Sequence, residues 1–218
     1  MDRALAIAAK QAAAGGTVYT LGKLIHNKEV TASLEERGIR PVEDISGLAP
    51  GDALVIRAHG APPQAYEQAR AAGLCLHDAT CPNVSWIHRL VKAAVSQGKD
   101  VVVVGKPDHP EVEGIVGWSG GRAAVVERPE DADTLGFGLD ALVVAQTTCR
   151  EEDFQQLVER IGPHCTAIEV ENTICRATAD RQREAEALAR QCDVMLVVGD
   201  GGSANTRKLA DTCRKYCK

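Results

Sequence analysis

The sequence predicts an α/β fold with parallel sheets, built from three related units in a pseudo-threefold arrangement. Short apolar runs alternate with amphipathic stretches of helical period, which is the pattern of strand–helix–strand units. The same order of features recurs along the chain, and such recurrence constrains the architecture before any single motif is weighed. The conspicuous polar residues follow the apolar runs, at the strand ends where parallel sheets bind their ligands.

The repeat is clearest when residues are counted from two cysteines. Steps of 24, 28 and 30 residues lead from Cys81 to Gly105, His109 and Glu111, and from Cys175 to Gly199, Ser203 and Asn205. The start of the chain offers a third copy, in which Gly22 and His26 imply a cysteine 24 residues before Gly22, at position −2. We therefore expect three converging cysteines, the first of them upstream of Met1.

The first expected domain, residues 1–80, opens with a helix over 2–14. Its apolar face includes Ala4, Ile7 and Ala8, and Gly15-Gly16 ends it. Glycine and proline turns separate the elements that follow. The expected strands are 17–21, 39–42, 53–56 and 74–76, and the remaining expected helices are 29–37 and 63–72.

The second expected domain, residues 81–172, repeats this plan, with an acidic turn after its second strand. Its expected helices are 84–97, 112–118 and 151–161, and its expected strands are 101–104, 123–126, 142–145 and 167–170. The third domain, residues 173–218, is expected to hold a helix over 174–190, a strand over 194–198 and a helix over 206–216. Because the first unit lacks an opening strand and the third stops early, we expect a fragment that is incomplete at both ends.

Composition narrows the classes of function. The 218 residues carry a net charge of −5 and only 3% aromatic residues, which argues against a nucleic-acid-binding surface. No secretory leader follows Met1, and no apolar run approaches the ~20 residues of a membrane-spanning helix. We expect a cytoplasmic protein that binds neither nucleic acid nor membrane.

The eight cysteines favour metal binding, catalysis or burial over disulfides, and no CxxC pair supports a zinc ribbon. Cys81 and Cys175 each lie at or beside the first turn of a helix, where unpaired N–H groups favour the thiolate. With a third cysteine they would form a three-thiolate site. Sulfur ligands alone allow an iron–sulfur cluster, zinc or copper(I). Plain burial is the alternative for this pair and the expectation for the other six cysteines.

Polar side chains at the strand ends suit a phosphate or diphosphate, because imidazole, hydroxyl and amide groups there act together with helix N-termini. These candidates are His26, His59, His109, Ser203 and Asn205. No GxGxxG or GxxxxGK[ST] loop indicates a nucleotide. We expect His77, His88 and His164 to be structural, because a single histidine is most often a satisfied structural residue.

Glu111 has two interpretations. In Pro110-Glu-Val-Glu113 it complements the dipole of a helix N-terminus, or it is the carboxyl group that supplies protons in the pocket. The spacing of residues does not separate the two.

Seven motifs, spread over the whole chain, together resemble the LytB/IspH family of 4-hydroxy-3-methylbut-2-enyl diphosphate reductases. They are Ile25-His-Asn27, Ala58-His-Gly60, Asp78-Ala-Thr-Cys-Pro82, His109-Pro-Glu-Val-Glu-Gly114, Gln146-Thr-Thr148, Ile174-Cys175 and Ser203-Ala-Asn205. The resemblance implies three pseudo-equivalent α/β domains around a central [4Fe-4S] cluster.

The resemblance also implies a role for each candidate. Cys81 and Cys175 would be two of three cluster ligands, and Glu111 would deliver protons. Thr147 would contact the substrate near its hydroxyl group. His26, His59, His109, Ser203 and Asn205 would bind the diphosphate and line the pocket. The implied reaction is a two-electron reductive dehydroxylation to isopentenyl and dimethylallyl diphosphate, with a ferredoxin or flavodoxin as electron donor.

The chain departs from the family pattern in three places. Only Asp2-Arg3 remains of the stretch that carries the family's first cysteine, Ala204 replaces a frequent serine, and the remainder of the third domain would lie beyond Lys218. We expect that Met1 is a valine-type start codon misread within a longer gene, and that two of three ligands give weak cluster binding and little activity. The alternatives are a metal-binding module without redox chemistry and an inactive fragment.

Overall fold

The structure is a computed structural model that describes residues 2–25 and 27–217. It divides into two compact units, the first formed by residues 1–93 and 108–121 and the second by 94–107 and 122–218. Each unit contains one four-stranded parallel sheet. The predicted α/β class with parallel sheets is therefore confirmed, while the division into three domains stays a prediction.

The sheet of the first unit has the strand order β2-β1-β3-β4. Its strands are β1 (Val18–Leu21), β2 (Ile39–Val42), β3 (Ala53–Ile56) and β4 (Cys75–Asp78). Strand β3 lies between β1 and β4, and three of its four residues are buried. A parallel strand covered on both faces reads as a continuous apolar run, which is why Ala-Leu-Val-Ile was recognisable in the sequence.

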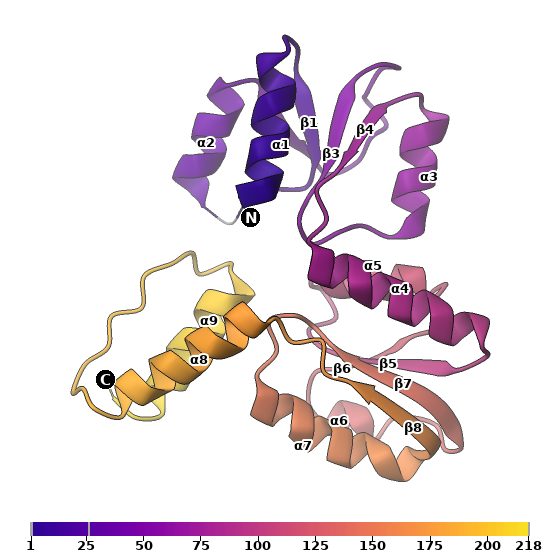
Figure 1. Ribbon diagram of the computed structural model, residues 1–218, viewed down its shortest axis with the longest axis vertical. Coiled ribbons are helices and arrows are strands. Elements are labelled where there is room, and N and C mark those ends of the chain that lie inside the picture. Colours follow the sequence, from indigo (N-terminus) through magenta and orange to yellow (C-terminus); the bar gives the residue numbers. More distant parts are fainter. Residues whose placement is uncertain (1, 26, 218) are drawn as a thin grey trace. The chain divides into compact units, whose positions relative to one another are not determined.

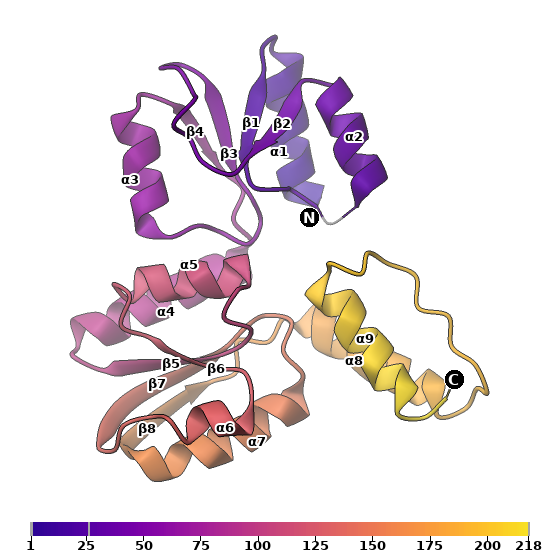
Figure 2. The ribbon, with the colours of Figure 1, turned by 180° about the vertical axis from the view of Figure 1, so that it is seen from behind.

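Helices cover both faces of this sheet (Figures 1 and 2). They are α1 (Asp2–Ala13) and α2 (Lys28–Glu36) on one face and α3 (Pro63–Ala71) on the other. The larger part of α4 (Pro82–Ser96) and α5 (Pro110–Trp118) also belong to this unit. Val55 packs into the cluster formed with α1 and α2, whereas Leu54 and Ile56 pack into the cluster formed with α3. The alternation follows from the two-residue period of a strand.

The second sheet repeats the topology of the first, with the strand order β6-β5-β7-β8. Its strands are β5 (Asp100–Val104), β6 (Ala124–Val126), β7 (Leu139–Ala145) and β8 (Cys165–Glu171). In both sheets the first strand in sequence lies between the second and the third. The shared order confirms the internal repeat for these two units.

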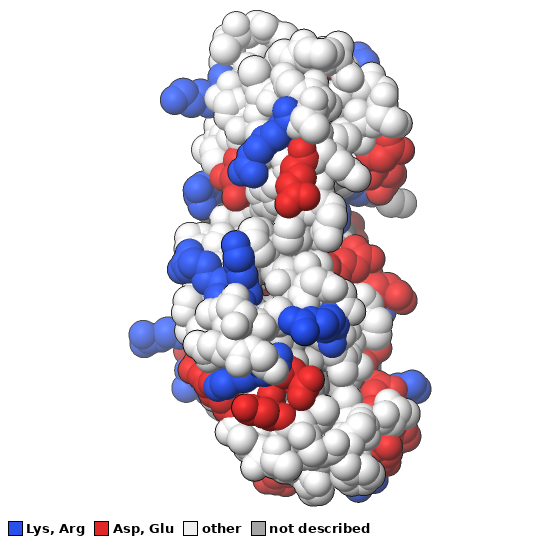
Figure 3. All heavy atoms as spheres, turned by 90° about the vertical axis from the view of Figure 1, so that its right-hand side faces the viewer, with Lys and Arg blue, Asp and Glu red and all other residues white. Residues whose placement is uncertain are grey.

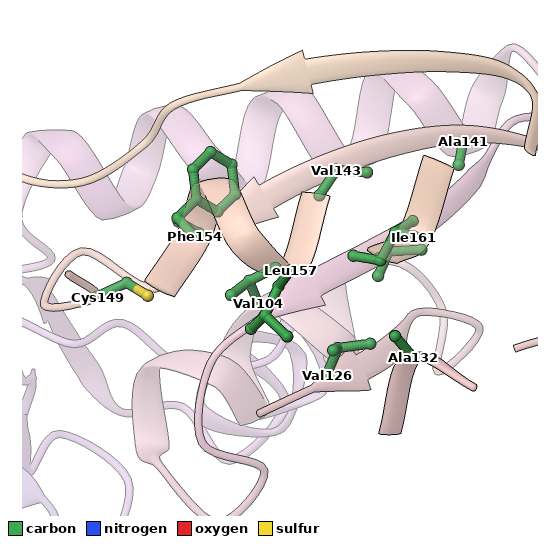
Figure 4. Packing of buried hydrophobic residues seen from close by; sticks show 11 residues of the cluster. Val104, Val126, Ala132, Ala141, Val143, Cys149, Phe154, Leu157 and Ile161 are labelled. Atoms are coloured by element: carbon green, nitrogen blue, oxygen red, sulfur yellow. The ribbon is translucent and has the colours of Figure 1, made fainter. Parts of the chain in front are cut away.

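Helices α6 (Pro129–Ala132) and α7 (Glu151–Ile161) pack on one face of the second sheet, and a short 3-10 turn (Gly162–His164) follows α7. Figure 4 shows Phe154, Leu157 and Ile161 of α7 lying against valines of the strands. Each of these α7 side chains is buried, so truncation of one to alanine is expected to cost about 2–5 kcal/mol.

The third repeat differs from its prediction. Helices α8 (Arg176–Ala189) and α9 (Ala204–Arg214) pack side by side, as Figure 1 shows. The strand predicted over 194–198 is wrong, because this segment pairs with no strand among the described residues. Val194, Leu196 and Val198 are 69%, 86% and 87% exposed. A strand needs a neighbour for its backbone hydrogen bonds, and apolar residues alone do not supply one.

Other differences are small. The acidic turn contains the single helical turn α6, since Pro129 occupies its first turn and Asp131 accepts from the N–H groups of Glu127 and Arg128. Strand β7 begins at Leu139, three residues before the predicted start at 142. None of the described helices is long and apolar enough to span a membrane.

Basic and acidic side chains stand close together on the face drawn in Figure 3. Many of the ion pairs join residues three or four positions apart on one helix, such as Arg214 with Asp211 and Arg190 with Glu186. Pairs of this kind contribute a few tenths of a kcal/mol each, so the apolar cores carry most of the stability.

Candidate active site

Three helices of the repeat begin at polar caps. The Asn27 side chain accepts a hydrogen bond from the Val30 N–H of α2 at 3.1 Å, and the Ser203 hydroxyl accepts from the Thr206 N–H of α9 at 3.4 Å. In α5 the cap is His109, whose Nδ1 accepts from the Glu111 N–H at 3.1 Å. At His109 and Ser203 the repeated spacing therefore marks helix N-termini, which are intrinsic anion-binding positions.

In the first unit, the loop after β3 lies against the cysteine turn. The Cys81 N–H donates to the carbonyl of Ala58 at 2.9 Å, which ties the turn to the residue before His59. Gly60 closes the loop with a φ of 74°, a backbone conformation that suits glycine. The chain thus brings His59 and Cys81 to the carboxyl end of the same sheet.

A group of side-chain hydrogen bonds stabilises the turn that leads to Cys81. Asp78 accepts from the Thr80 N–H at 2.9 Å and from the Thr80 hydroxyl at 2.5 Å, and the Tyr66 hydroxyl lies 3.1 Å from the same hydroxyl oxygen. Burial raises the pKa of Tyr66, so its hydroxyl stays protonated. Because Thr80 directly precedes Cys81, these contacts fix the position of Cys81 at the start of α4.

The first unit also brings together two of the predicted histidines. The rings of His59 and His109 meet edge to face, with centroids 5.4 Å apart and planes at 89°. Since Nδ1 of His109 accepts a hydrogen bond, a neutral His109 carries its proton on Nε2 and presents a donor there. A ligand with phosphate oxygens suits such a donor.

Glu111 occupies the first turn of α5 and is only 2% exposed. A carboxyl group so placed lies within two residues of His109 and beside the helix N-terminus. Both interpretations from the sequence remain, because the same position serves a dipole partner and a proton donor.

The second unit holds its cysteine in the same manner. The Cys175 N–H donates to the carbonyl of Thr147 at 2.9 Å, and Cys175 caps α8. Thr147 lies two residues after the end of β7, just as Ala58 lies two residues after the end of β3. The backbone N–H of each cysteine is thus hydrogen-bonded to the loop that follows the third strand of its sheet.

Ser203 and Asn205 lie at the N-terminus of α9. The Oδ1 atom of Asn205 is buried and has no hydrogen-bond partner among the described residues. A buried amide oxygen without a partner is costly, which is the usual property of a group that awaits a ligand. Ala204 between them has no hydroxyl group to add.

His26 lies outside the described residues, so its predicted role has no structural counterpart here. Within residues 2–25 and 27–217, no group of three or more His, Cys, Asp or Glu side chains is placed to bind a metal ion. The donors that are present nevertheless suit a thiolate-ligated cluster. Both cysteines stand at helix N-termini, and both are only partly buried.

Arg57 was missed by sequence reasoning. Its guanidinium group lies over Gly22, and a Cβ atom at Gly22 would come within 2.1 Å of Nη1. Burial lowers the pKa of Arg57, while Glu113 and Glu43 oppose this effect. The available signal was its place directly after strand β3, next to the His59 loop.

Comparison with known proteins agrees with this geometry. The family model described as LytB protein matches residues 1–218. A 4-hydroxy-3-methylbut-2-enyl diphosphate reductase of Caldanaerobacter subterraneus subsp. tengcongensis is 40% identical over 203 residues, which are 92% of this chain and 70% of the relative. The reductase of Geotalea uraniireducens is 43% identical over 213 residues, 98% of this chain and 75% of the relative.

Solved structures give the same result. The E-1-hydroxy-2-methyl-but-2-enyl-4-diphosphate reductase from Plasmodium falciparum matches with a TM-score of 0.93 and 30% identity, over 98% of this chain and 69% of that one. A second structure, of the terminal enzyme of the non-mevalonate pathway, matches with a TM-score of 0.75 and 37% identity, over 99% of this chain and 78% of that one. These coverages are consistent with the expectation of an incomplete chain. The chain belongs to the LytB family of 4-hydroxy-3-methylbut-2-enyl diphosphate reductases.

Proposed function

We propose that this chain binds 4-hydroxy-3-methylbut-2-enyl diphosphate and takes part in its reduction to isopentenyl and dimethylallyl diphosphate. The observation that carries the proposal is the convergence in the first unit. The backbone of Cys81 is hydrogen-bonded to the loop of His59, and that loop meets His109, two residues before the buried Glu111. A thiol, two imidazoles and a carboxyl group gathered in one compact unit suit a reductase of a diphosphate ester.

We assign binding of the diphosphate to His59 and His109, and the family resemblance gives the same role to Ser203 and Asn205. His109 accepts a hydrogen bond at Nδ1, so a neutral ring carries its proton on Nε2, which is the form that donates to phosphate oxygens. For Asn205 the support is its side-chain NH2 group, which can donate to phosphate oxygens, and its place in the first turn of α9. His26 belongs to the same set by its place in the repeat.

The reaction replaces a hydroxyl group by hydrogen. The carbon–oxygen bond breaks, two electrons and two protons enter, and one molecule of water leaves. We assign the protons to Glu111, because it is buried next to the diphosphate-binding histidine, and we assign to Thr147 the contact near the substrate hydroxyl. Strand β7 presents Thr147 two residues after its end, in the turn that fixes Cys175.

Cys81 and Cys175 are proposed as ligands of a [4Fe-4S] cluster, which when bound supplies the electrons. A ferredoxin or flavodoxin is the proposed source of those electrons. The residues of the chain fix the thiols through the paired backbone hydrogen bonds at Ala58 and Thr147. The two cysteines lie at the N-termini of α4 and α8.

The proposal is tested by calorimetric titration of the chain with 4-hydroxy-3-methylbut-2-enyl diphosphate. Replacement of His59 or His109 by alanine is expected to weaken binding by about tenfold or more, because each removes a hydrogen bond to a charged group. His164→Ala is the control, since His164 binds the carbonyl of Leu135 in the second unit. Equal affinity in all three variants and the unmodified chain would show that these histidines do not bind the diphosphate.

A further inference from the structure

His88, which the sequence marked as structural, lies where the functional elements of the first unit meet. It is 4% exposed and belongs to α4, two turns beyond Cys81. Its ring stacks on Trp118 of α5, with centroids 5.4 Å apart and planes at 22°. One imidazole therefore links the cysteine helix to the helix that begins at His109.

The opposite edge of the ring meets two glycines. A Cβ atom at Gly60 would lie 2.6 Å from Cε1 of His88, and a Cβ atom at Gly114 would lie 3.4 Å from Nε2. Gly60 follows His59 directly, and Gly114 lies three residues after Glu111 on α5. The ring thus fills the space between the His59 loop and α5, and any larger residue at Gly60 would displace it.

The ring is held in this position by packing. Its Nε2 atom is buried and has no hydrogen-bond partner among the described residues. Burial lowers the pKa of His88 to about 4, with Asp78 opposing the effect, so the ring is neutral near pH 7. A neutral aromatic ring with no hydrogen bond at Nε2 acts here through its shape.

Trp118 closes the same arrangement from α5. Its Nε1 donates to the carbonyl of Ala61 at 3.1 Å, so the residue after Gly60 is bound to the helix on which His88 rests. This hydrogen bond therefore joins the His59 loop to α5, while the imidazole ring of His88 lies between them. These contacts therefore fix the distance between the His59 loop and α5, because packed protein interiors deform little.

We propose that His88 is a positioning residue of the reductase: its ring is a wedge against Gly60 and Gly114 that sets the separation of His59 from His109 and Glu111. The inference rests on the proposed function, in which these side chains serve the diphosphate and the proton. The separation of the His59 and His109 rings is measured without any ligand.

The test compares His88→Ala with Leu74→Ala. Leu74 is a buried residue of the same unit, 8% exposed, but it lies before β4, at the amino end of the strands. Both variants lose packing, so both are expected to lower the melting temperature. Only His88→Ala is expected to weaken the nuclear Overhauser contact between the His59 and His109 rings and to lower the affinity for inorganic pyrophosphate, by about fivefold or more.

A second variant keeps the inference falsifiable if His88→Ala is too unstable. In the His88→Ala/Gly114→Ala variant, the added methyl group points into the space that the ring left, and we expect part of the ring contact and of the pyrophosphate affinity to return. A purely structural role predicts no such return at a temperature well below melting.

Two results overturn the wedge. One is an unchanged His59–His109 contact in folded His88→Ala, and the other is an equal loss of affinity in Leu74→Ala and His88→Ala. Failure of the proposed function looks different, because then His59→Ala and His109→Ala bind pyrophosphate as tightly as the unmodified chain. In that case the contact between the His59 and His109 rings still tests the positioning role of His88.

Discussion

The ionisation of His88 links one residue to the stability of the first unit. Its pKa is about 4 in the folded chain and near 6.5 when exposed, so the unfolded chain binds more protons between these values. The free energy of unfolding should therefore fall as the pH drops from 6.5 to 4, and the contribution of His88 is roughly 3 kcal/mol.

Urea unfolding at several pH values measures this effect. His88→Phe removes the titrating group and keeps an aromatic ring against Trp118, so its stability should decline less over the same interval. Parallel curves for the two proteins would mean that His88 is solvated or charged in the folded chain.

Gly22 and Gly120 give a second test at the residue scale. Their φ angles are 70° and 69°, but a Cβ atom at Gly22 would meet the Arg57 guanidinium, whereas one at Gly120 would have no described atom within 4 Å. Alanine at either position costs about 1–2 kcal/mol of backbone strain.

The cost at Gly22 should be larger by about 1 kcal/mol, because Arg57 is half-buried and has to move. In an Arg57→Ala background this excess is expected to vanish in a double-mutant cycle of unfolding free energies. A persistent excess would mean that the guanidinium group does not occupy the space above Gly22.

Single residues differed in how far the sequence revealed them. Cys81, Cys175, His109 and Ser203 were found because a fixed spacing repeated, and the structure shows that three of these positions are helix caps. Arg57 and His88 were not recognised, since their surroundings come from residues distant in sequence. Burial and ring stacking of that kind leave no local pattern.

At the scale of elements, the close approach of α5 to α3 depends on Gly117. A Cβ atom there would lie 2.4 Å from Cβ and 3.0 Å from Cα of Pro62, which is too close for a rigid ring to accommodate. Gly117→Ala should therefore lower the unfolding free energy by about 1–3 kcal/mol, although alanine is the better helix former.

Gly162→Ala is the matched control, because Gly162 has helical dihedral angles and no described atom within 4 Å of the added methyl group. It should be neutral or stabilising by about 0.5–1 kcal/mol. If both variants gain stability in urea titrations, α5 does not pack on Pro62 as described.

The elements themselves were largely predictable. Apolar runs such as 53–56 and 101–104 became strands because a neighbour covers each face, and caps and glycines set the helix ends within a few residues. The run at 194–198 has the same composition and forms no strand. Its apolar composition fits a buried strand. A strand also needs a neighbouring strand to pair with, and the local sequence does not show whether one is present.

At the scale of the whole molecule, this unpaired run predicts association. Val194, Leu196 and Val198 alternate along an exposed segment, which favours pairing between chains. Leu196→Lys/Val198→Lys should reduce light scattering at high protein concentration without lowering the melting temperature. A fall in melting temperature of several degrees would show instead that the segment packs against its own chain.

The two sheets share one strand order and one way of fastening a cysteine, and this duplication supports assigning both thiols to one kind of ligand. Solved structures of the family share the fold over almost the whole chain. The central proposal is that Cys81 and Cys175 bind iron and sulfide.

Iron and acid-labile sulfide, measured after anaerobic reconstitution, test this claim most directly in the chain and in its Cys81→Ser, Cys175→Ser and Cys192→Ser variants. Cys192 is exposed and outside the repeat, so it serves as the control. We expect iron and sulfide in equal amounts, at an occupancy below one cluster per chain because two thiols hold it weakly, and a loss of both in Cys81→Ser and Cys175→Ser only. Bound zinc without sulfide, or iron contents that are the same in all four proteins, would contradict the account.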